Sequence, residues 1–293
     1  MSPVEIGMLS VVAIVVLVYM GLYIPIALGL VSFVSVWIMS GKSILAFNFL
    51  KIAVGDGVTE YNFATIPLFT LMGLLVSKAG LGRDIYDVMN STFRKVLAGI
   101  GMATVGANAV FAAITGSSIA SASVFTKISV PEMLRYNYNK RFAVGVVAGS
   151  SVLGMIIPPS AMLIIYSFIS EQSVGDMFLA GIVPGLLLTG AYIFAIFTMA
   201  RIWPSYIGQD IKADEMPALD TSETIHKAWP VIALIFLVLG GIYTGWLTPV
   251  EAGAAGASLA LVIAALRKSM SWNGLWSTLV ETGHITAAIL LLI

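Results

Sequence analysis

The chain of 293 residues contains no cysteine, and only 10% of its residues are charged. Without cysteine it can form no disulfide, no thiol nucleophile and no cysteine metal site. Soluble domains commonly carry about 25% charged residues, so this composition excludes an ordinary soluble domain. The formal net charge is zero, and nothing in the composition indicates that the chain binds nucleic acid.

The sequence also lacks the short motifs that accompany enzymatic or ATP-driven chemistry. It has no HExxH motif, no P-loop and no dinucleotide fingerprint. Its N-terminus has neither a basic region nor a small-residue cleavage pattern, so residues 6–20 are predicted to be a retained helix and not a cleaved signal. We therefore expect a protein that is not an enzyme and uses no cofactor.

Apolar residues dominate what is present. They make up 59% of the chain, and the mean hydropathy is +0.98. Repeated runs of about 20 apolar residues predict an all-α protein that crosses a membrane several times. Full crossings are expected at about residues 6–22, 25–39, 62–76, 177–203, 228–247 and 249–266.

Two further apolar segments are interrupted near their midpoints. Residues 97–130 are too short for two crossings and a turn, which need over 40 residues, so we expect a re-entrant helical hairpin with its tip at residues 114–118. Residues 142–170 are interrupted by Pro158-Pro159-Ser160 and are expected to form a broken helix. Irregular backbone at membrane depth must be buried in protein or line a watery cavity. The two breaks are therefore expected to meet and form half of an ion and solute site.

Basic residues predict the orientation in the membrane. They cluster at residues 78–95 and 127–141, on both sides of the expected hairpin. A re-entrant hairpin places both clusters on one side, which the positive-inside rule makes cytoplasmic. The N-terminus is then periplasmic, and residues 204–226 form a cytoplasmic linker.

The order of crossings predicts an inverted repeat. Residues 1–203 contain five expected crossings when the broken helix at 142–170 is counted with the four full ones. Because five is an odd number, a second copy would start from the opposite side, as in secondary transporters. Pro25 with Gly29 matches Pro249 with Gly253. The expected division is scaffold helices and an interfacial arm at 1–95, half of a transport domain at 96–175, the last helix of the first repeat at 176–203, the linker at 204–226, and an incomplete second repeat at 227–293.

The two breaks have the chemistry of a sodium and carboxylate site. Pro158 removes the helical donor of the Gly154 carbonyl, and Pro159 removes that of the Met155 carbonyl. Such freed carbonyls carry partial negative charge, which suits sodium, whereas N–H groups and hydroxyls at the hairpin tip suit a carboxylate. The candidate sodium ligands are Thr115, Gly116, Ser117, Ser118, Gly154, Met155 and Pro158, with no other metal expected. The candidate substrate contacts are Ser117, Ser118, Pro159 and Ser160.

Structural alternatives exist for each of these features. Proline kinks and small residues are ordinary in membrane helices, where serine can satisfy a freed carbonyl. Thr248-Pro249-Val250-Glu251 repeats the capping pattern of Ser2-Pro3-Val4-Glu5. Glu251 is therefore interpreted as a helix cap, and a role in ion coupling is the alternative.

Several of these stretches resemble the large membrane subunit of tripartite ATP-independent periplasmic (TRAP) transporters. The strings that carry the resemblance are Gly116–Ser121, Val130–Leu134, Asn139–Phe142, Gly154–Ser160, Glu171–Ser173, Gly240–Tyr243 and Thr248–Ala252. The resemblance implies sodium-coupled import of organic acid anions, such as C4-dicarboxylates or sugar acids, by an elevator motion in the bacterial inner membrane. Ser117, Ser118 and Gly154–Ser160 would then build the first sodium site and one wall of the solute site.

The same resemblance implies partners and a longer chain. A periplasmic solute-binding (P) protein delivers the organic acid, and a small membrane (Q) subunit braces the large one within the lipid bilayer. Members of the family run beyond residue 293 and contain a second hairpin, so this sequence is expected to be truncated at its C-terminus.

Two other functions remain open at this stage. A stand-alone sodium–carboxylate symporter of related fold would need the same site chemistry but no binding protein. An intramembrane serine protease would use Ser118, which fits a Gly-x-Ser-x pattern, together with His284. Such a dyad needs the two side chains within hydrogen-bond reach, and nothing in the sequence brings them together.

Overall fold

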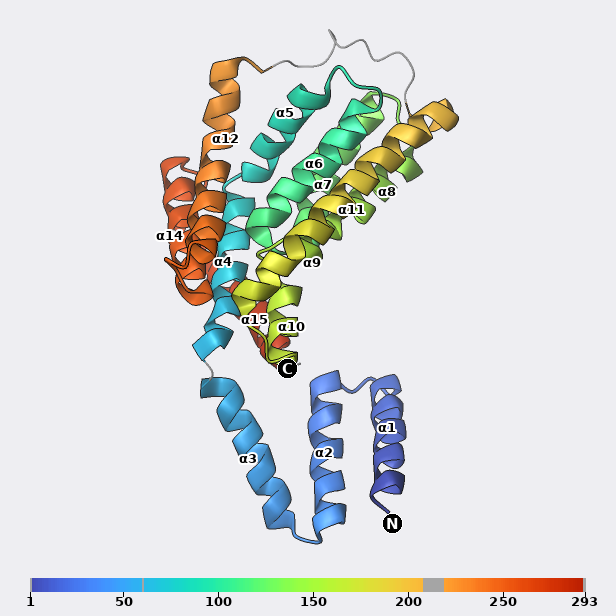
Figure 1. Cartoon of the computed structure of the whole chain (residues 1–293), viewed down its shortest axis with the longest axis vertical. Helices are drawn as coiled ribbons and strands as arrows, with labels where there is room; N and C mark the ends of the chain where they lie inside the picture. Colours follow the sequence, from blue (N-terminus) through green and yellow to red (C-terminus); the bar gives the residue numbers. More distant parts are fainter. Residues whose placement is uncertain (1, 60, 208–218, 292–293) are drawn as a thin grey trace. The chain divides into compact units, whose positions relative to one another are not determined.

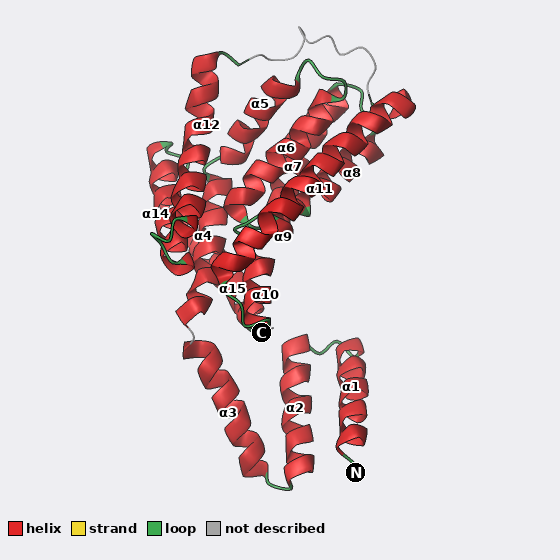
Figure 2. Ribbon diagram, viewed as in Figure 1, coloured by secondary structure: helices red, strands yellow, loops and turns green. Residues whose placement is uncertain are grey.

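The computed structural model describes residues 2–59, 61–207 and 219–291. Within these ranges every regular element is a helix, which confirms the all-α prediction (Figure 2). By length and composition, three of the described helices could cross a membrane, or up to five if each of two bent helix pairs is one span. The chain divides into two compact units, one of Met1–Ala64 with His284–Ile293 and one of Thr65–Gly283.

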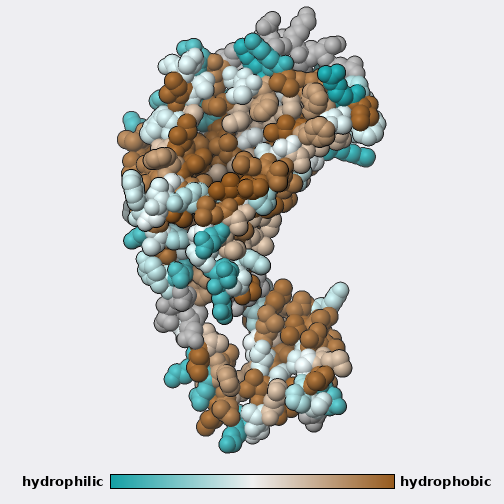
Figure 3. Space-filling model, in the orientation of Figure 1, coloured by the Kyte–Doolittle hydropathy of each residue, from teal (hydrophilic) through white to brown (hydrophobic). Residues whose placement is uncertain are grey.

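The first unit contains helices α1 (Pro3–Tyr19), α2 (Ile24–Ser40) and α3 (Ser43–Thr59), with the short 3-10 helix η1 (Tyr61–Ala64) (Figure 1). The expected crossings at 6–22 and 25–39 correspond to α1 and α2. The Ser2–Glu5 capping box forms as predicted, with the Ser2 backbone N–H donating to the Glu5 carboxylate at 3.0 Å. Apolar side chains cover much of the surface shown in Figure 3, as expected of helices that face lipid.

The second unit contains the two interrupted segments. The hairpin consists of α6 (Gly99–Thr115) and α7 (Ser118–Arg135), and the broken helix consists of α8 (Lys140–Ser151), α9 (Leu153–Ile156) and α10 (Ala161–Ile169). The two parts of the broken helix differ in direction by 42°. Both interruptions lie at the residues where glycine, serine and proline predicted them.

The other helices of this unit are α4 (Thr65–Lys78), α5 (Leu81–Phe93), α11 (Val174–Ile202), α12 (Thr221–Ile235), the π-helix η4 (Phe236–Gly240), α13 (Gly241–Tyr243) and α14 (Pro249–Leu266). Helix α15 (Trp272–Leu290) begins in this unit, which ends at Gly283. Figure 1 shows α6, α7, α8 and α11 side by side, and α6 contacts the other three. Of the expected linker at 204–226, residues 208–218 lie outside the described residues, as do 292–293 of the last segment.

Close packing of α14 on α4 depends on small residues. A Cβ on Gly256 would lie 2.4 Å from the Met72 sulfur, and one on Gly253 would lie 3.0 Å from the Leu68 Cβ. The two glycines are three residues apart and so lie on one face of α14, and small residues on such a face let membrane helices approach closely. At the start of α14 the Thr248 backbone N–H donates to Glu251 at 2.8 Å, so Glu251 is a helix cap as predicted.

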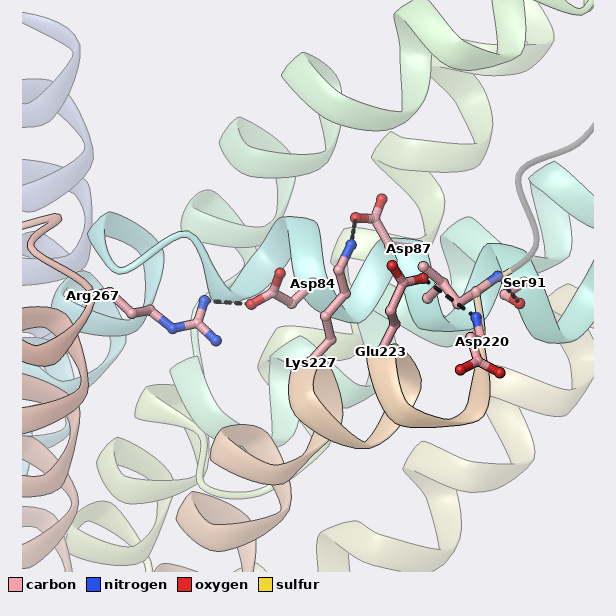
Figure 4. A network of polar contacts seen from close by, with 8 residues as sticks. Asp84, Asp87, Ser91, Asp220, Glu223, Lys227 and Arg267 are labelled. Carbon is pink, nitrogen blue, oxygen red and sulfur yellow. Dashed lines mark hydrogen bonds and ion pairs between the residues drawn. The ribbon is translucent and has the colours of Figure 1, made fainter.

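The amphipathic helix α5 is bent by 66° from the helical segment before it and is held to the C-terminal part of the unit by polar contacts (Figure 4). Asp84 pairs with Arg267 at the end of α14, and Asp87 pairs with Lys227 of α12. The Leu219 backbone N–H donates to the Ser91 hydroxyl at 3.2 Å. These contacts join residues that lie 128 to 183 positions apart in the sequence.

Candidate functional site

The tip of the hairpin and the break in the second helix are in direct contact. The Ala161 backbone N–H, in the first turn of α10, donates to the Gly116 carbonyl at 3.3 Å. A Cβ placed on Gly116 would lie only 2.0 Å from the Pro159 carbonyl oxygen. Thus residues 43 to 45 positions apart in the sequence form one backbone junction, as the sequence predicted.

A second contact joins the same two segments on α9. A Cβ on Gly154 would lie 2.7 Å from the Ser117 carbonyl carbon and 2.8 Å from the Ser118 nitrogen. The Gly154 backbone therefore lies against the peptide group that joins the two serines. Glycine is required there because any side chain would separate α9 from the hairpin tip.

Local capping explains why the hairpin turns at this point. Gly116 ends α6 with φ +57, a left-handed conformation that glycine adopts without steric cost. Ser117 then has extended backbone and caps α7, its hydroxyl accepting from the Ala120 N–H at 3.3 Å. Thr115 is buried and its hydroxyl donates to the Phe111 carbonyl at 2.9 Å, so its side chain is satisfied within its own helix.

The two carbonyls freed by the prolines have different surroundings. The Ser160 hydroxyl donates to the Met155 carbonyl at 2.8 Å and replaces the donor that Pro159 lacks. The Gly154 carbonyl receives no such bond from a side chain in the described part of the protein. Of the two carbonyls, that of Gly154 therefore keeps more capacity to bind a cation.

The candidate residues differ in their exposure. Gly116, Gly154, Pro158, Pro159 and Ser160 are buried, whereas Ser117 and Ser118 are half-buried. Ser160 is 0% exposed with its hydroxyl already engaged, so its side chain serves the backbone in this structure. Ser117 and Ser118 are the candidate side chains that a solute could reach.

Glycines on two neighbouring helices pack around the junction, and sequence reasoning missed them. A Cβ on Gly73 of α4 would lie 2.8 Å from the Thr115 carbonyl oxygen. On α11, a Cβ on Gly181 would lie 2.6 Å from the Ile156 carbonyl oxygen, and one on Gly185 would lie 2.6 Å from the Ile157 side chain. The four-residue spacing of the α11 glycines was the signal in the sequence, but it does not identify the partner.

A buried side-chain contact also links the first limbs of the two segments, α6 and α8. The Asn108 amide nitrogen of α6 donates to the Ser150 hydroxyl oxygen of α8 at 2.7 Å, and both residues are 0% exposed. Sequence reasoning missed this pair too, although an asparagine within a charge-free apolar segment is a visible signal.

The electrostatics of the junction come from peptide groups and hydroxyls. No group of three or more His, Cys, Asp or Glu side chains that could hold a metal occurs among the described residues. The C-terminal end of α6 offers carbonyl oxygens, and the N-terminal ends of α7 and α10 offer N–H groups. Neutral oxygens of this kind suit a hard monovalent cation, and the N–H groups suit a carboxylate.

A protein-family model described as "Tripartite ATP-independent periplasmic transporter, DctM component" matches residues 11–293. The chain belongs to this family. The predicted resemblance to the TRAP large membrane subunit is therefore confirmed, and with it the expectation of a multi-pass inner-membrane protein.

Curated relatives of this TRAP large subunit are themselves named as TRAP transporter large permeases. The chain is 31% identical over 249 residues to the C4-dicarboxylate TRAP transporter large permease protein DctM of Pseudomonas aeruginosa, covering 83% of this chain and 56% of that protein. It is 34% identical over 209 residues to DctM of Vibrio cholerae, covering 70% of this chain and 44% of the relative. It is 27% identical over 247 residues to the sialic acid TRAP transporter large permease protein SiaM of Vibrio cholerae, covering 84% of this chain and 57% of the relative.

The chain thus spans about half the length of the curated relatives that it matches. Those relatives are named as transporter permeases and not as enzymes, which confirms that the TRAP large subunit is not an enzyme. The serine-protease alternative is abandoned on that ground.

Proposed function

We propose that this chain is the large membrane subunit of a sodium-coupled TRAP transporter that imports organic acid anions by an elevator mechanism. The three relatives described above are named for C4-dicarboxylates or sialic acid, and each of these is a carboxylate. A further relative is named for isethionate, an organic anion with a sulfonate group. A periplasmic solute-binding (P) protein delivers the anion, and a small membrane (Q) subunit braces this chain in the lipid bilayer. The N-terminus lies on the periplasmic side.

The observation that supports this proposal most is the backbone junction between the hairpin tip and the broken helix. The Ala161–Gly116 hydrogen bond and the approach of Gly154 to Ser117–Ser118 bring four helix ends together. Helix ends leave carbonyl and N–H groups unpaired, and in a membrane such groups are tolerated only where a ligand, water or protein satisfies them.

Sodium would bind to neutral oxygens at this junction. The Gly154 carbonyl lacks a side-chain donor in the described structure, and the Thr115 carbonyl lies at the end of α6 against Gly73. The remaining candidate ligands are Gly116, Ser117, Ser118, Met155 and Pro158. Hard cations prefer oxygen ligands, and a monovalent ion does not need a carboxylate to balance its charge.

The organic acid would bind where N–H groups and hydroxyls face the same space. Ser117 and Ser118 are half-buried at the N-terminus of α7, and Pro159 and Ser160 precede the N-terminus of α10. A carboxylate near such an N-terminus is favoured by the helix dipole and by the free N–H groups. Pro159 and Ser160 would contribute backbone rather than side-chain groups.

The elevator assignment is supported by how the second unit is joined. Helices α6 to α10 contact one another through the junction, and α5 packs against α6 while its ion pairs reach α12 and α14. We infer that α6 to α10 move as one body and that α5 connects this body to α12 and α14.

Uptake by the complete transporter in liposomes tests the proposal. Imposed sodium gradients should drive entry of succinate or sialic acid only when the cognate binding protein is added, and Ser118→Ala should raise the sodium concentration needed for half-maximal uptake. Potassium gradients serve as the control. Sodium-independent uptake would overturn the coupling, and uptake without any binding protein would favour the stand-alone symporter.

A further inference from the structure

Asn108 places an amide in the interior of α6, where its neighbours are apolar. Its side chain is 0% exposed and its amide nitrogen donates to the Ser150 hydroxyl oxygen at 2.7 Å. Ser150 is also 0% exposed and lies on α8. The contact therefore joins the first limb of the hairpin to the first limb of the broken helix.

The direction of this hydrogen bond is determined by the chemistry of its partners. The Ser150 hydroxyl hydrogen is donated to the Val146 carbonyl at 2.6 Å, so the Ser150 oxygen can only accept from Asn108. The Asn108 nitrogen must then face Ser150, and its Oδ1 atom has no hydrogen-bond donor among the described residues. An apolar residue at position 108 could not replace this donor.

The pair lies close to the junction along both helices. Asn108 precedes Thr115 by seven residues and Ser150 precedes Gly154 by four, which corresponds to about 10 Å and about 6 Å along the helix axes. At the junction, Gly154 approaches Ser117 and Ser118 so closely that a methyl group would not fit. A small slide of α8 along α6 would therefore change the positions of the Gly154 carbonyl and the hairpin tip.

We propose that Asn108 and Ser150 are a positioning pair for the sodium site. By holding the register of α8 against α6, they keep the Gly154 carbonyl at the distance from Ser117 and Ser118 that sodium binding requires. The inference rests on the proposed function, because it presupposes that sodium binds at the junction.

Thr104 provides a matched control on the same helix. It is also 0% exposed, but its hydroxyl donates only to the Ile100 carbonyl of its own helix, at 2.9 Å. Thr104→Val therefore removes a buried polar group of α6 without removing a contact between helices. If the change in sodium binding came only from losing a buried polar group, Thr104→Val would show the same change.

The test is a sodium titration of thermal unfolding with the purified complete transporter, at constant ionic strength kept with choline chloride. Sodium should raise the unfolding temperature of the wild-type protein in a saturable way. Asn108→Leu and Ser150→Ala should each raise the half-saturating sodium concentration about 3- to 20-fold, the range that measured interhelical hydrogen bonds in membranes imply. The double variant should equal the single variants, and Thr104→Val should match the wild type.

Each alternative outcome is distinct. If sodium does not protect the wild-type protein, the proposed sodium site itself fails. If sodium protects the wild type and both single variants at the same concentration, with only a lower starting temperature, the pair is merely structural and this inference fails. If Asn108→Leu does not fold, the small truncation Ser150→Ala decides the question, because an unchanged half-saturation there also overturns the pair.

Discussion

The junction between the hairpin tip and the broken helix can be tested by a single methyl group on Gly116. Gly116→Ala has two consequences, because Gly116 has φ +57 and its Cβ position lies 2.0 Å from the Pro159 carbonyl oxygen. Placing alanine in the left-handed region costs about 1–2 kcal/mol. Since Cβ atoms essentially never lie closer than 3.0 Å to such a neighbour, the Pro159 carbonyl must also retreat by about 1 Å.

That retreat acts directly on the contact that joins the two segments. The Ala161–Gly116 hydrogen bond is already 3.3 Å long, and a further 1 Å breaks it, at a cost of about 1 kcal/mol. The total cost of Gly116→Ala is therefore about 2–3 kcal/mol. Displacement of Pro159 also separates the groups proposed to bind sodium, so the protection by sodium should be largely lost.

Gly245→Ala separates the two consequences of the methyl group. Gly245 also has a left-handed φ, +74, but nothing lies within 4 Å of its Cβ position. It should cost only the conformational 1–2 kcal/mol and leave the sodium dependence unchanged. The assay is thermal unfolding of both variants with sodium chloride or choline chloride. If both variants lower the unfolding temperature equally, and sodium still stabilises Gly116→Ala as it does the wild type, the proposed role of the junction in sodium binding is refuted.

Three further predictions concern the surroundings of the junction. Gly185→Ala should weaken the stabilisation of the fold by sodium, because its methyl group would lie 2.6 Å from the Ile157 side chain. Gly190→Ala on the same helix should leave that stabilisation unchanged, because nothing lies within 4 Å of its methyl group. Thermal unfolding of both variants at increasing sodium concentrations makes the comparison. Asp84→Asn and Arg267→Gln should be non-additive in a double-mutant cycle, with a coupling of about 0.5–1 kcal/mol for this partly exposed pair, and additive unfolding free energies would argue against it. Thr248→Ala should remove the α14 cap at a cost of about 1 kcal/mol without changing half-saturation by sodium.

The sequence predicted the breaks because their causes are local. Proline cannot donate a helical hydrogen bond wherever it occurs, so Pro158-Pro159 interrupted the second segment at the observed place. Glycine followed by serines ended one helix and capped the next at Gly116 and Ser117. The capping role of Glu251 followed from its spacing to Thr248 in the same way.

The contacts around the breaks could not be predicted because they depend on tertiary packing. Gly73 and Gly185 are two of many glycines in apolar helices, and the sequence does not indicate that they meet Thr115 and Ile157. The expected contact between Ser160 and the substrate stays a prediction, and the structure adds that the Ser160 hydroxyl donates to the Met155 carbonyl. A serine near a broken helix has both options, and only the local geometry decides between them.

The same limit applies to the charges of α5. An interfacial arm was expected within residues 1–95, and the amphipathic helix α5 lies in that range. Its ion-pair partners on α12 and α14 are 140 and 183 positions away, a separation at which no local pattern gives the pairing.

In the second unit, ionised side chains and the partial charges of helix ends lie in different places. Asp84, Asp87, Lys227 and Arg267 have partly exposed side chains, where the cost of desolvating an ion pair is small. At the junction of the two breaks the polar groups are peptide carbonyls, N–H groups and hydroxyls. A carboxylate at membrane depth would bind sodium strongly but would be costly when the ion leaves. The proposed site would fill and empty in each transport cycle. Helix ends suit such a site because their partial charges can attract both a cation and a carboxylate, and they cost less than a full charge when neither is bound.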